Sequence, residues 1–352
     1  MNNKTVSGLI EKITSAIADI KPQFQEVCPI SIINFEKWDW TQGVGLFTLW
    51  QYYKLSGNTA TRARIEKWFD DRFAEGLPEK NINTMCPMLT LTCLYEETNN
   101  PKYLPYLHEW ADYALNGLTR TTEGGFQHDG TKCINVEELW DDTMYMTVMF
   151  MAKYGKVFQK AEYVEESEYQ YLLHIKYLVD RKSGLWYHGW SFLRGDHYAG
   201  GLWGRGNSWI TAAIPDYLEI ANPQGSVKRL ILETYKRQVD ALLKTQDEEG
   251  MRHTIIDDPT SYQESSATAN FAYGILKGVR LGYLDESYLP CANKAISALI
   301  DCIDENGVVG KCSYGTNVGK TLQEYKDIPI CPMPYGQTLT ALALMEYLKR
   351  NA

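Results

Sequence analysis

Polar side chains that could take part in chemistry concentrate in three short segments rich in aromatic residues. Residues 139–143 read Leu-Trp-Asp-Asp-Thr, residues 184–190 read Gly-Leu-Trp-Tyr-His-Gly-Trp, and residues 203–209 read Trp-Gly-Arg-Gly-Asn-Ser-Trp. Sugars present flat C–H faces that rest on aromatic rings, and their hydroxyl groups need fixed polar partners. Trp interleaved with Asp, His and Arg therefore predicts a carbohydrate-binding cleft.

Each charged residue in these segments also has a structural interpretation. Asp142 stands directly before the apolar run 143–150, where an Asp is a good N-cap, and the local pattern by itself favours the cap. An isolated histidine is more often structural, but two tryptophans and two glycines around His188 favour the cleft. The glycines beside Arg205 leave room for a ligand. Its guanidinium can bind a carboxylate through two hydrogen bonds, or pair with a neighbouring acid.

The ten tryptophans are unevenly distributed. Trp38 and Trp40 precede an apolar segment, Trp140 lies two residues before Asp142, and others flank His188 and Arg205. Any one of them can be core filler between helices. Core tryptophans, however, would follow helical periodicity, whereas these lie in glycine-rich loops or at helix starts. As a set they indicate the walls of a binding site.

Signatures of metal binding and of disulfides are missing from the sequence. It contains no CxxC pair and no HExxH, and residues 141–145 do not match the DDxxD magnesium motif because the last position is Tyr145. The eight cysteines are scattered, which favours free thiols. We expect no metal and no cofactor.

The elements that carry these segments are predicted to be helices in a repeat. Apolar residues recur with helical spacing, and prolines and glycines fall between the helical stretches. A polar or glycine-containing turn followed by a largely apolar stretch recurs at positions 42, 83, 142, 207, 268 and 337. More polar, amphipathic segments lie between, such as 58–71 and 227–244. A helix that is apolar nearly all round is a buried one.

Six such units predict an all-α fold, the (α/α)6 toroid, in which buried inner helices are ringed by polar outer helices. An open solenoid is the alternative architecture. In a toroid the N-terminal turns of the inner helices gather at one end, where free backbone N–H groups and polar caps converge. We therefore expect the active site at that end.

Bulk properties narrow the function further. The 352 residues include 44% hydrophobic residues, enough for a large core, and we expect one domain over 1–352. With a net charge of −9 and no basic stripe, a nucleic-acid partner is not expected. No apolar run is long enough for a membrane span, and the N-terminus does not read as a signal peptide, which predicts a cytoplasmic protein. The sequence contains no heptad seam that would indicate an oligomer interface.

Together these segments resemble glycoside hydrolase family 105, the unsaturated rhamnogalacturonyl hydrolases. The likeness runs from about Trp38 to the C-terminus, and the Trp-Asp-Asp-Thr and Arg-Gly-Asn-Ser-Trp segments in this order are fairly specific. The matching stretches are residues 39–44, 83–88, 124–128, 138–147, 184–190 and 203–209.

The resemblance implies a hydrolase that removes a 4,5-unsaturated uronic acid from the non-reducing end of small pectin-derived oligosaccharides. It implies that Asp142 protonates C4 of the enol ether, that water adds at C5, and that the hemiketal opens and releases the rest of the saccharide. Such an acid needs a raised pKa near neutral pH. Apolar neighbours and Asp141 would raise the pKa of Asp142, whereas a helix N-terminus would lower it.

The same resemblance suggests substrate contacts. It places Arg205 near the uronate carboxylate or its hydroxyls, Trp209 against a sugar face and His188 on a hydroxyl group. The remaining substrate-binding candidates are Trp40, Asn83, His128, Trp140 and Trp203. The residue at Trp40 often differs in the family, which affects sugar preference.

Other functions fit the same barrel. Family 88, the unsaturated glucuronyl hydrolases, shares the fold and the reaction, but commonly has a His-Asp pair where this chain reads Asn83-Thr84. Ordinary inverting hydrolysis would need a second carboxylate, such as Asp141, Glu138 or Asp196. Sugar epimerisation would more naturally use paired histidines. A glycan-binding protein without turnover is a further alternative.

Overall fold

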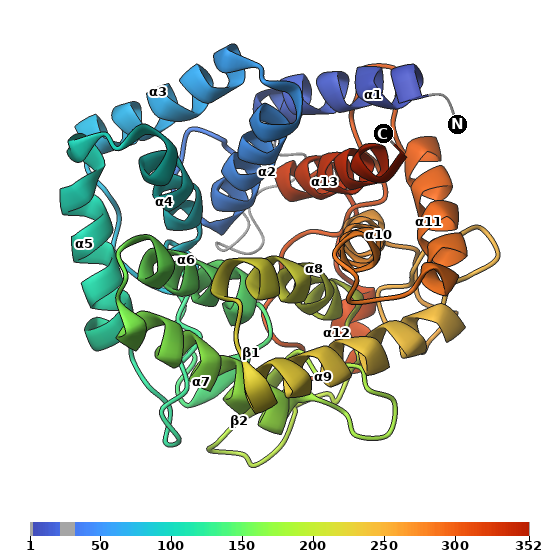
Figure 1. Cartoon of the computed structure of the whole chain (residues 1–352). Helices are drawn as coiled ribbons and strands as arrows, with labels where there is room; N and C mark the ends of the chain where they lie inside the picture. The colour runs from blue at the N-terminus through green and yellow to red at the C-terminus, as the bar shows by residue number, and fades with distance from the viewer. Residues whose placement is uncertain (1–2, 22–31, 352) are drawn as a thin grey trace.

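Helices alternate between an inner and an outer ring along the chain. The computed structural model describes residues 3–21 and 32–351, so Cys28 lies outside the described residues. Within them, six inner helices surround the ring axis, each covered by an outer helix (Figure 1). The inner helices are α2 (Trp40–Ser56), α4 (Cys86–Thr98), α6 (Met149–Val157) with a wide turn (Met144–Val148) before it, α8 (Gly204–Ala221), α10 (Ser265–Arg280) and α13 (Pro334–Asn351). The outer helices are α1 (Asn3–Ala16), α3 (Thr59–Glu75), α5 (Leu104–Asp112), α7 (Ala161–Leu178), α9 (Gly225–Lys244) and α11 (Leu289–Asp301).

The two rings differ as the apolar patterning predicts. α8 is buried from Gly204 through Leu218, whereas α3 buries only Ile65, Trp68, Phe69 and Arg72. α3 starts where the Asn58 side chain accepts hydrogen bonds from the N–H groups of Ala60 and Thr61. The preceding helix α2 ends at Gly57, in the left-handed conformation (φ 68°) that glycine adopts without strain. The predicted all-α fold is confirmed.

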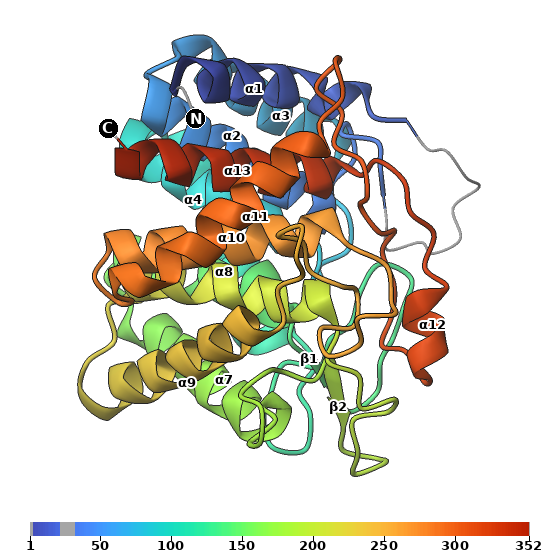
Figure 2. The same cartoon turned by 90° about the vertical axis from the view of Figure 1, so that its right-hand side faces the viewer.

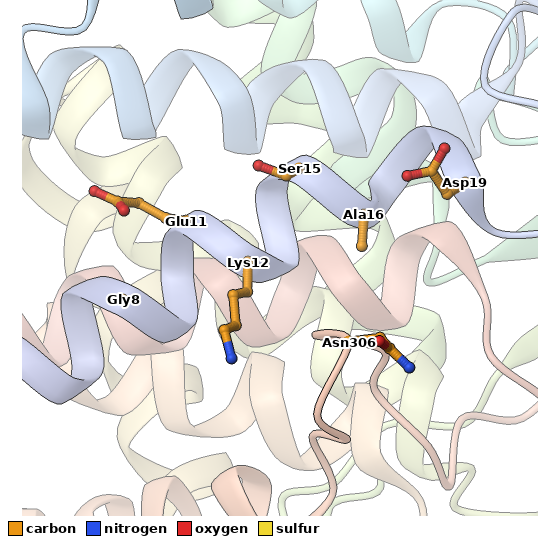
Figure 3. Close-up of a pocket in the computed structure, with 7 residues that line it drawn as sticks. All are labelled: Gly8, Glu11, Lys12, Ser15, Ala16, Asp19 and Asn306. Carbon is orange, nitrogen blue, oxygen red and sulfur yellow. The ribbon is translucent and has the colours of Figure 1, made fainter.

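The two ends of the chain together complete the sixth hairpin. α13 packs against α10 on one side and α2 on the other, and α1 covers it, so the ring is closed and the open solenoid is wrong. The sequence indicated six successive units, whereas in the described residues the outer position over α13 is taken by α1 from the other end of the ring. Lys12 Nζ donates to the Glu305 carbonyl at 3.4 Å, and Figure 3 shows α1 lying over the loop that carries Asn306.

One end of the ring carries the irregular structure. A two-stranded antiparallel sheet of β1 (Glu138–Trp140) and β2 (Gly189–Ser191), the short helix α12 (Leu322–Lys326) and the long loops lie there (Figure 2). The inner helices α2, α4, α6, α8 and α10 are each followed by an outer helix that runs back, so the N-terminal turns of the inner helices point to this same end. This is the end at which the repeat predicted the active site.

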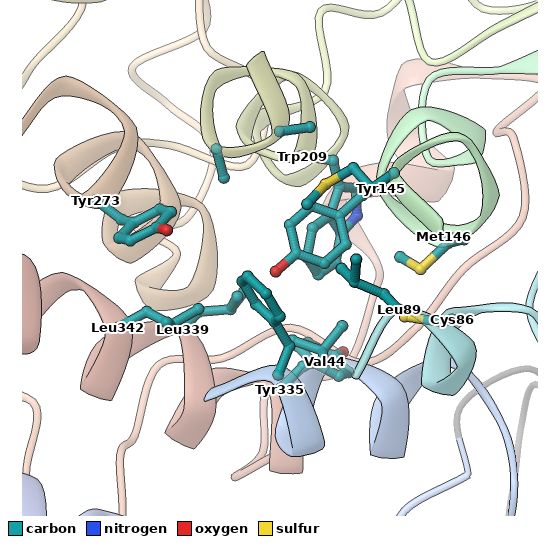
Figure 4. Packing of buried hydrophobic residues seen from close by; sticks show 14 of the residues in the cluster. Val44, Cys86, Leu89, Tyr145, Met146, Trp209, Tyr273, Tyr335, Leu339 and Leu342 are labelled. Carbon is teal, nitrogen blue, oxygen red and sulfur yellow. The ribbon is translucent and has the colours of Figure 1, made fainter. Parts of the chain in front are cut away.

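Side chains from all six inner elements meet on the ring axis (Figure 4). Those labelled are Val44, Cys86, Leu89, Tyr145, Met146, Trp209, Tyr273, Tyr335, Leu339 and Leu342. α8 and α10 approach so closely that a Cβ at Gly274 would lie 2.2 Å from the Thr211 carbonyl oxygen, which leaves room only for glycine. The axis is thus filled by side chains, and the pocket with tryptophan walls opens at the end of the ring.

Two expectations from the sequence, free cysteine thiols and no membrane span, concern features that the structure also describes. Seven cysteines of the described residues are free thiols. Among residues 3–21 and 32–351, no helix is both long and apolar enough to cross a membrane.

Candidate active site

A narrow pocket opens at the loop-rich end of the ring, over the N-terminal turns of the inner helices. It is lined by Trp40, Asn83, His128, Trp140, Asp142, Met146, Trp203, Arg205, Gly315 and Thr316. Seven of the nine residues singled out from the sequence are in this lining; His188 and Trp209 are not. About 20 Å³ of open space remains between these side chains, enough for a water molecule.

The β1–β2 pairing brings Asp142 and His188 together. In this register Trp140 lies opposite Gly189, and the N–H of Asp141 donates to the His188 carbonyl at 3.0 Å. Asp142 Oδ2 consequently lies 3.2 Å from His188 Nε2. His188 is 2% exposed, so it faces the carboxyl group from behind the pocket wall and is not itself part of the lining.

The Asp142 side chain does not cap a helix. The wide turn Met144–Val148 begins after Thr143, which makes no side-chain cap bond. Asp142 contributes only its carbonyl, which accepts from the N–H groups of Tyr145 and Met146 at 3.0 Å each. The N-cap interpretation of this side chain is therefore wrong, and the carboxyl group is free to face His188 and the pocket.

Asp141 is a fully buried carboxyl group beside Asp142. It is 0% exposed, and neither of its oxygens makes a well-formed hydrogen bond within the described residues, although the Asp142 carboxyl group and the N–H groups of Asp141 and Asp142 lie close to them. It packs on the first turn of α8, where a Cβ at Gly206 would lie 2.5 Å from Asp141 Oδ2. An isolated buried carboxylate is costly, so Asp141 is expected to be neutral and to donate its proton to Asp142.

The two carboxyl groups have opposite pKa shifts. Burial, followed by the negative charge of Asp142, raises the pKa of Asp141 well above its ordinary value. Burial also raises the pKa of Asp142, but the hydrogen bond with His188 and the electrostatic influence of His188 and His128 outweigh it, so the net pKa is lowered. The pair therefore holds one proton, on Asp141. The sequence left open which effect wins at Asp142, and the histidines decide it.

Two neutral histidines flank Trp140. The His128 ring stacks on it with centroids 4.3 Å apart, and the His188 ring lies 5.4 Å away. His128 Nδ1 is 2.8 Å from Thr143 Oγ1, and burial lowers the pKa of His128 to about 3. Burial also lowers the pKa of His188, against the opposing effect of Asp142. Both imidazoles are therefore uncharged near neutral pH.

Arg205 is tied to the main chain of a distant loop. One of its terminal nitrogens donates to the Ser313 carbonyl at 3.0 Å and to the Ser313 hydroxyl, and the other donates to the Tyr314 carbonyl at 2.8 Å. The rings of Trp203 and Tyr335 pack against the guanidinium, with centroids 4.5 Å and 5.1 Å away. Arg205 lines the pocket, but its partners are carbonyl and hydroxyl oxygens, so the pairing with a neighbouring acid is not observed.

Trp209 lies in the core below the pocket. It is 0% exposed and packs against Tyr145, with centroids 5.0 Å apart, and against the edge of Trp40, 5.9 Å away. The sequence-based expectation placed Trp209 against a sugar face. In this position it supports Trp40, which reaches the pocket.

Sequence reasoning missed the residues between α11 and α13 that reach the site. Gly315 and Thr316 line the pocket, and Tyr325 on α12 places its hydroxyl 2.9 Å from His188 Nδ1. They lie outside the six repeated turns and carry no motif of their own. Only the folding of residues 312–333 across the end of the ring brings them there.

A cation is the alternative to the shared proton. Ligand atoms of Asp141, Asp142 and His188 lie within 4.8 Å of one another. A single proton on Asp141 joins one oxygen of each carboxyl group. A cation held there would instead need both carboxyl groups ionised and would take the place of that proton.

Comparisons with known proteins agree with this architecture. The family model described as Glycosyl Hydrolase Family 88 matches residues 10–351. The unsaturated rhamnogalacturonyl hydrolase YesR of Bacillus subtilis (strain 168) is 32% identical over 343 residues, covering 96% of each chain. An unsaturated 3S-rhamnoglycuronyl hydrolase of Alteromonas sp. (strain LOR) is 27% identical over 67% of this chain and 56% of its own.

Solved structures give the same result. A protein of Salmonella enterica described as a possible member of family 105 superposes with a TM-score of 0.96 at 43% identity, covering 100% of this chain and 96% of its own. A family 105 glycoside hydrolase of C. acetobutylicum superposes with a TM-score of 0.83 at 25% identity over 98% of both chains. The chain therefore belongs to the glycoside hydrolase family 88 and 105 enzymes, as its resemblance to family 105 led us to expect.

Proposed function

We propose that this protein removes the 4,5-unsaturated uronic acid from the non-reducing end of small rhamnogalacturonan oligosaccharides. The observation that carries the proposal is the Asp141–Asp142–His188 cluster at the base of a pocket with tryptophan walls. One protonated carboxyl group beside one ionised one suits the hydration of an enol ether. The relatives named for unsaturated rhamnogalacturonyl and rhamnoglycuronyl hydrolysis support the substrate class.

The proton inventory suggests how Asp142 becomes an acid. Before substrate binds, the Asp142 carboxylate accepts hydrogen bonds from Asp141 and from His188 Nε2. An entering uronate brings a negative charge and excludes water, which raises the pKa of Asp142 and draws the Asp141 proton onto it. Asp142 can then deliver this proton to C4 of the double bond.

The later steps return the proton. Protonation at C4 leaves a cation at C5 that is stabilised by the ring oxygen, and water adds there. The carboxylate of Asp142 takes the proton that this water loses, and the pair regains its single proton. The C5 hemiketal opens, and the hemiacetal formed at C1 releases the remaining saccharide as an alcohol. A 5-keto sugar acid is the second product.

The residues of the pocket walls are assigned to different parts of the substrate. We assign the sugar faces to Trp40, Trp140 and Trp203, and hydroxyl groups to Asn83 and His128. The part of the Arg205 guanidinium that reaches the pocket would meet the uronate carboxylate. Because the open space is only about 20 Å³, the lining residues must move apart as a sugar ring enters.

Turnover of an unsaturated disaccharide by Asp142→Asn tests the proposal. The wild-type protein should remove the ultraviolet absorbance of the conjugated double bond and release the keto sugar acid. Asn cannot donate a proton to carbon, so the rate should fall by about 10²–10⁴. Asp196→Asn is the matched control, since Asp196 is exposed and pairs with Arg194 at 2.9 Å. Disaccharide consumption by Asp142→Asn at the wild-type rate would contradict the assignment.

The choice of substrate separates the alternatives. Lyase products of rhamnogalacturonan, other pectins and glycosaminoglycans should be offered in parallel, and we expect the first to turn over fastest. Hydrolysis of a saturated uronide would instead favour a second carboxylate acting as base. Tight binding of the disaccharide without turnover would favour a binding protein.

A further inference from the structure

Tyr325 places its hydroxyl group on the far side of His188 from Asp142. It lies on α12, is 1% exposed, and its ring centroid is 5.8 Å from those of both His188 and Trp203. Tyr325 Oη is 2.9 Å from His188 Nδ1, and the N–H of Gly319 donates to the same oxygen at 2.9 Å. Burial raises the pKa of Tyr325, so its hydroxyl keeps its hydrogen.

Counting donors and acceptors fixes the direction of these bonds. Within the part of the chain that the structure describes, the Tyr325 hydroxyl contacts only the Gly319 N–H and His188 Nδ1. Gly319 must donate, so the single hydrogen of the hydroxyl is left for Nδ1, which then accepts. A neutral imidazole with an accepting Nδ1 carries its proton on Nε2.

The opposite tautomer would leave two faults in a buried site. A proton on Nδ1 would point at Tyr325, whose own hydrogen would then have no acceptor. The bare Nε2 would face Asp142 Oδ2 at 3.2 Å, with two acceptors in contact. Neither fault occurs when Nε2 carries the proton, because both contacts of the ring are then donor-to-acceptor.

We propose that Tyr325 is a positioning residue that locks His188 in its Nε2–H tautomer, so that His188 in turn orients the Asp142 carboxyl group. This inference rests on the function proposed above. Asp142 touches the reacting atoms, whereas Tyr325 acts only through the imidazole. The side-chain partners of the Asp142 carboxyl group among the described residues are His188 and Asp141, and of these the imidazole keeps its proton when the Asp141 proton moves to Asp142.

Other titratable groups surround His188 but do not replace Tyr325. Within the described ranges none of them hydrogen-bonds to Nδ1, and they act on the imidazole through space or at Nε2. They are Asp142 and Asp141 after β1, Glu138 on β1, Arg205 on α8 and His128 in the preceding loop.

Nitrogen NMR of histidine-labelled wild-type protein tests the tautomer without any substrate. We expect His188 to show a protonated Nε2 and an unprotonated Nδ1 across neutral pH. The six histidines allow assignment by loss of one signal pair in His188→Ala. A protonated Nδ1 would overturn the proposal. Because this readout needs no turnover, it stands or falls independently of the proposed reaction.

Tyr325→Phe tests the effect on catalysis. It keeps the ring against Trp203 and removes only the hydroxyl. We expect kcat to fall about 10- to 100-fold with KM within about twofold, and His188 to populate both tautomers. Tyr262→Phe is the matched control, because its hydroxyl donates to the Tyr325 carbonyl at 3.2 Å and does not reach His188. Equal losses in the two variants would indicate a merely structural effect.

A double-mutant cycle completes the test. If Tyr325 acts through His188, Tyr325→Phe should cost no further activity in a His188→Ala background. Additive losses would show that Tyr325 works by another route and would contradict the proposal. Failure of the wild-type protein to consume any unsaturated disaccharide would instead count against the proposed function, while the NMR result would still report on the tautomer.

Discussion

Asp142 is set apart from the other acidic residues of this chain by its neighbours and not by its burial. Asp39, Asp141 and Asp216 are more deeply buried. Among the acidic residues that the structure describes, only Asp142 combines a pocket position with a histidine donor at 3.2 Å and a second carboxyl group beside it. The raised pKa that acid catalysis needs resides in Asp141, so we assign the stored proton and the delivered proton to different residues.

Asp141→Asn separates proton storage from simple hydrogen bonding. The amide still donates toward Asp142 but cannot release a proton to it. We expect kcat to fall about 10- to 1000-fold, with a melting temperature at or above that of the wild type, because a buried titratable group is removed. Steady-state kinetics with the unsaturated disaccharide and thermal melts measure both. Wild-type kcat would mean that Asp141 serves only as a neutral donor.

At the level of elements, the β1–β2 pairing and the first turn of α8 hold the cluster together. The strand register places His188 opposite Asp141, and α8 presses Gly206 against the Asp141 carboxyl group. Each element adds one side chain to the pocket lining, Trp140 from β1 and Arg205 from α8. Their function is to fix distances between side chains that come from separate repeats.

Gly206→Ala should disturb the cluster without unfolding the helix. The new Cβ would lie 2.5 Å from Asp141 Oδ2 and 2.9 Å from the Trp203 ring, so one of them must move. We expect activity to fall at least about tenfold, since small displacements of positioned groups are costly in rate. Gly8→Ala in α1 is the control, because nothing lies within 4 Å of its added Cβ and the change should favour the helix by about 0.5–1 kcal/mol. Full activity of Gly206→Ala would show that the cluster tolerates displacement.

Asp39, the N-cap of α2, is predicted to reduce stability at neutral pH. Its Oδ1 accepts from the Trp40 N–H at 2.8 Å and its Oδ2 accepts from the Thr131 hydroxyl, yet burial raises its pKa from 3.8 to about 6. A carboxyl group with a higher pKa in the folded state is ionised first in the unfolded chain. The free energy of unfolding therefore falls as pH rises from about 4 to 6.

Asp39→Asn should remove this pH dependence. Asn is also a good N-cap, so the variant should unfold with a free energy about 1–3 kcal/mol higher at pH 7 and unchanged below pH 4. Urea unfolding followed by circular dichroism at both pH values measures the difference. A variant that is less stable at pH 7 would show that the ionised carboxylate is the better cap.

For the whole molecule, closure of the ring depends on residues from both ends of the chain. α13 supplies the sixth inner helix and α1 its cover, so the last hairpin forms only when α1 meets α13. We propose that the ring is one cooperative domain. Its loop-rich end gathers a site from segments as distant as Trp40 and Thr316.

Ile13→Ala tests this closure. Ile13 lies on the buried face of α1 and is 0% exposed. Its truncation should lower the free energy of unfolding by about 2–5 kcal/mol. Ser15→Ala, on the exposed face of the same helix, should change it by less than about 0.5 kcal/mol. Helicity and activity should be lost in one denaturant transition in all three proteins. An early loss of part of the helicity with activity retained would show that α1 is not part of the cooperative unit.

The sequence by itself determined the repeat, the helix classes and most of the pocket. Apolar periodicity separates inner from outer helices because burial acts on every turn of a helix, and the recurring polar turns at positions 83, 142 and 207 predicted which end carries the site. Trp40, Trp140 and Arg205 were identified because glycine-rich aromatic loops differ from core patterns. These patterns are local, because each one involves residues that lie close together in the sequence.

Only the tertiary structure decided which groups touch. The Asp142–His188 distance depends on a strand register between residues about fifty positions apart, and Tyr325 reaches the site across a loop without any motif. The pKa order within the Asp pair depends on burial and on nearby histidines, which no spacing encodes. Trp209 follows the same aromatic pattern as Trp203, yet it lies six residues further along α8, in the core below the pocket. Contacts between distant segments are fixed by packing of the closed ring. Local sequence patterns do not predict these contacts, because each pattern spans only a few residues.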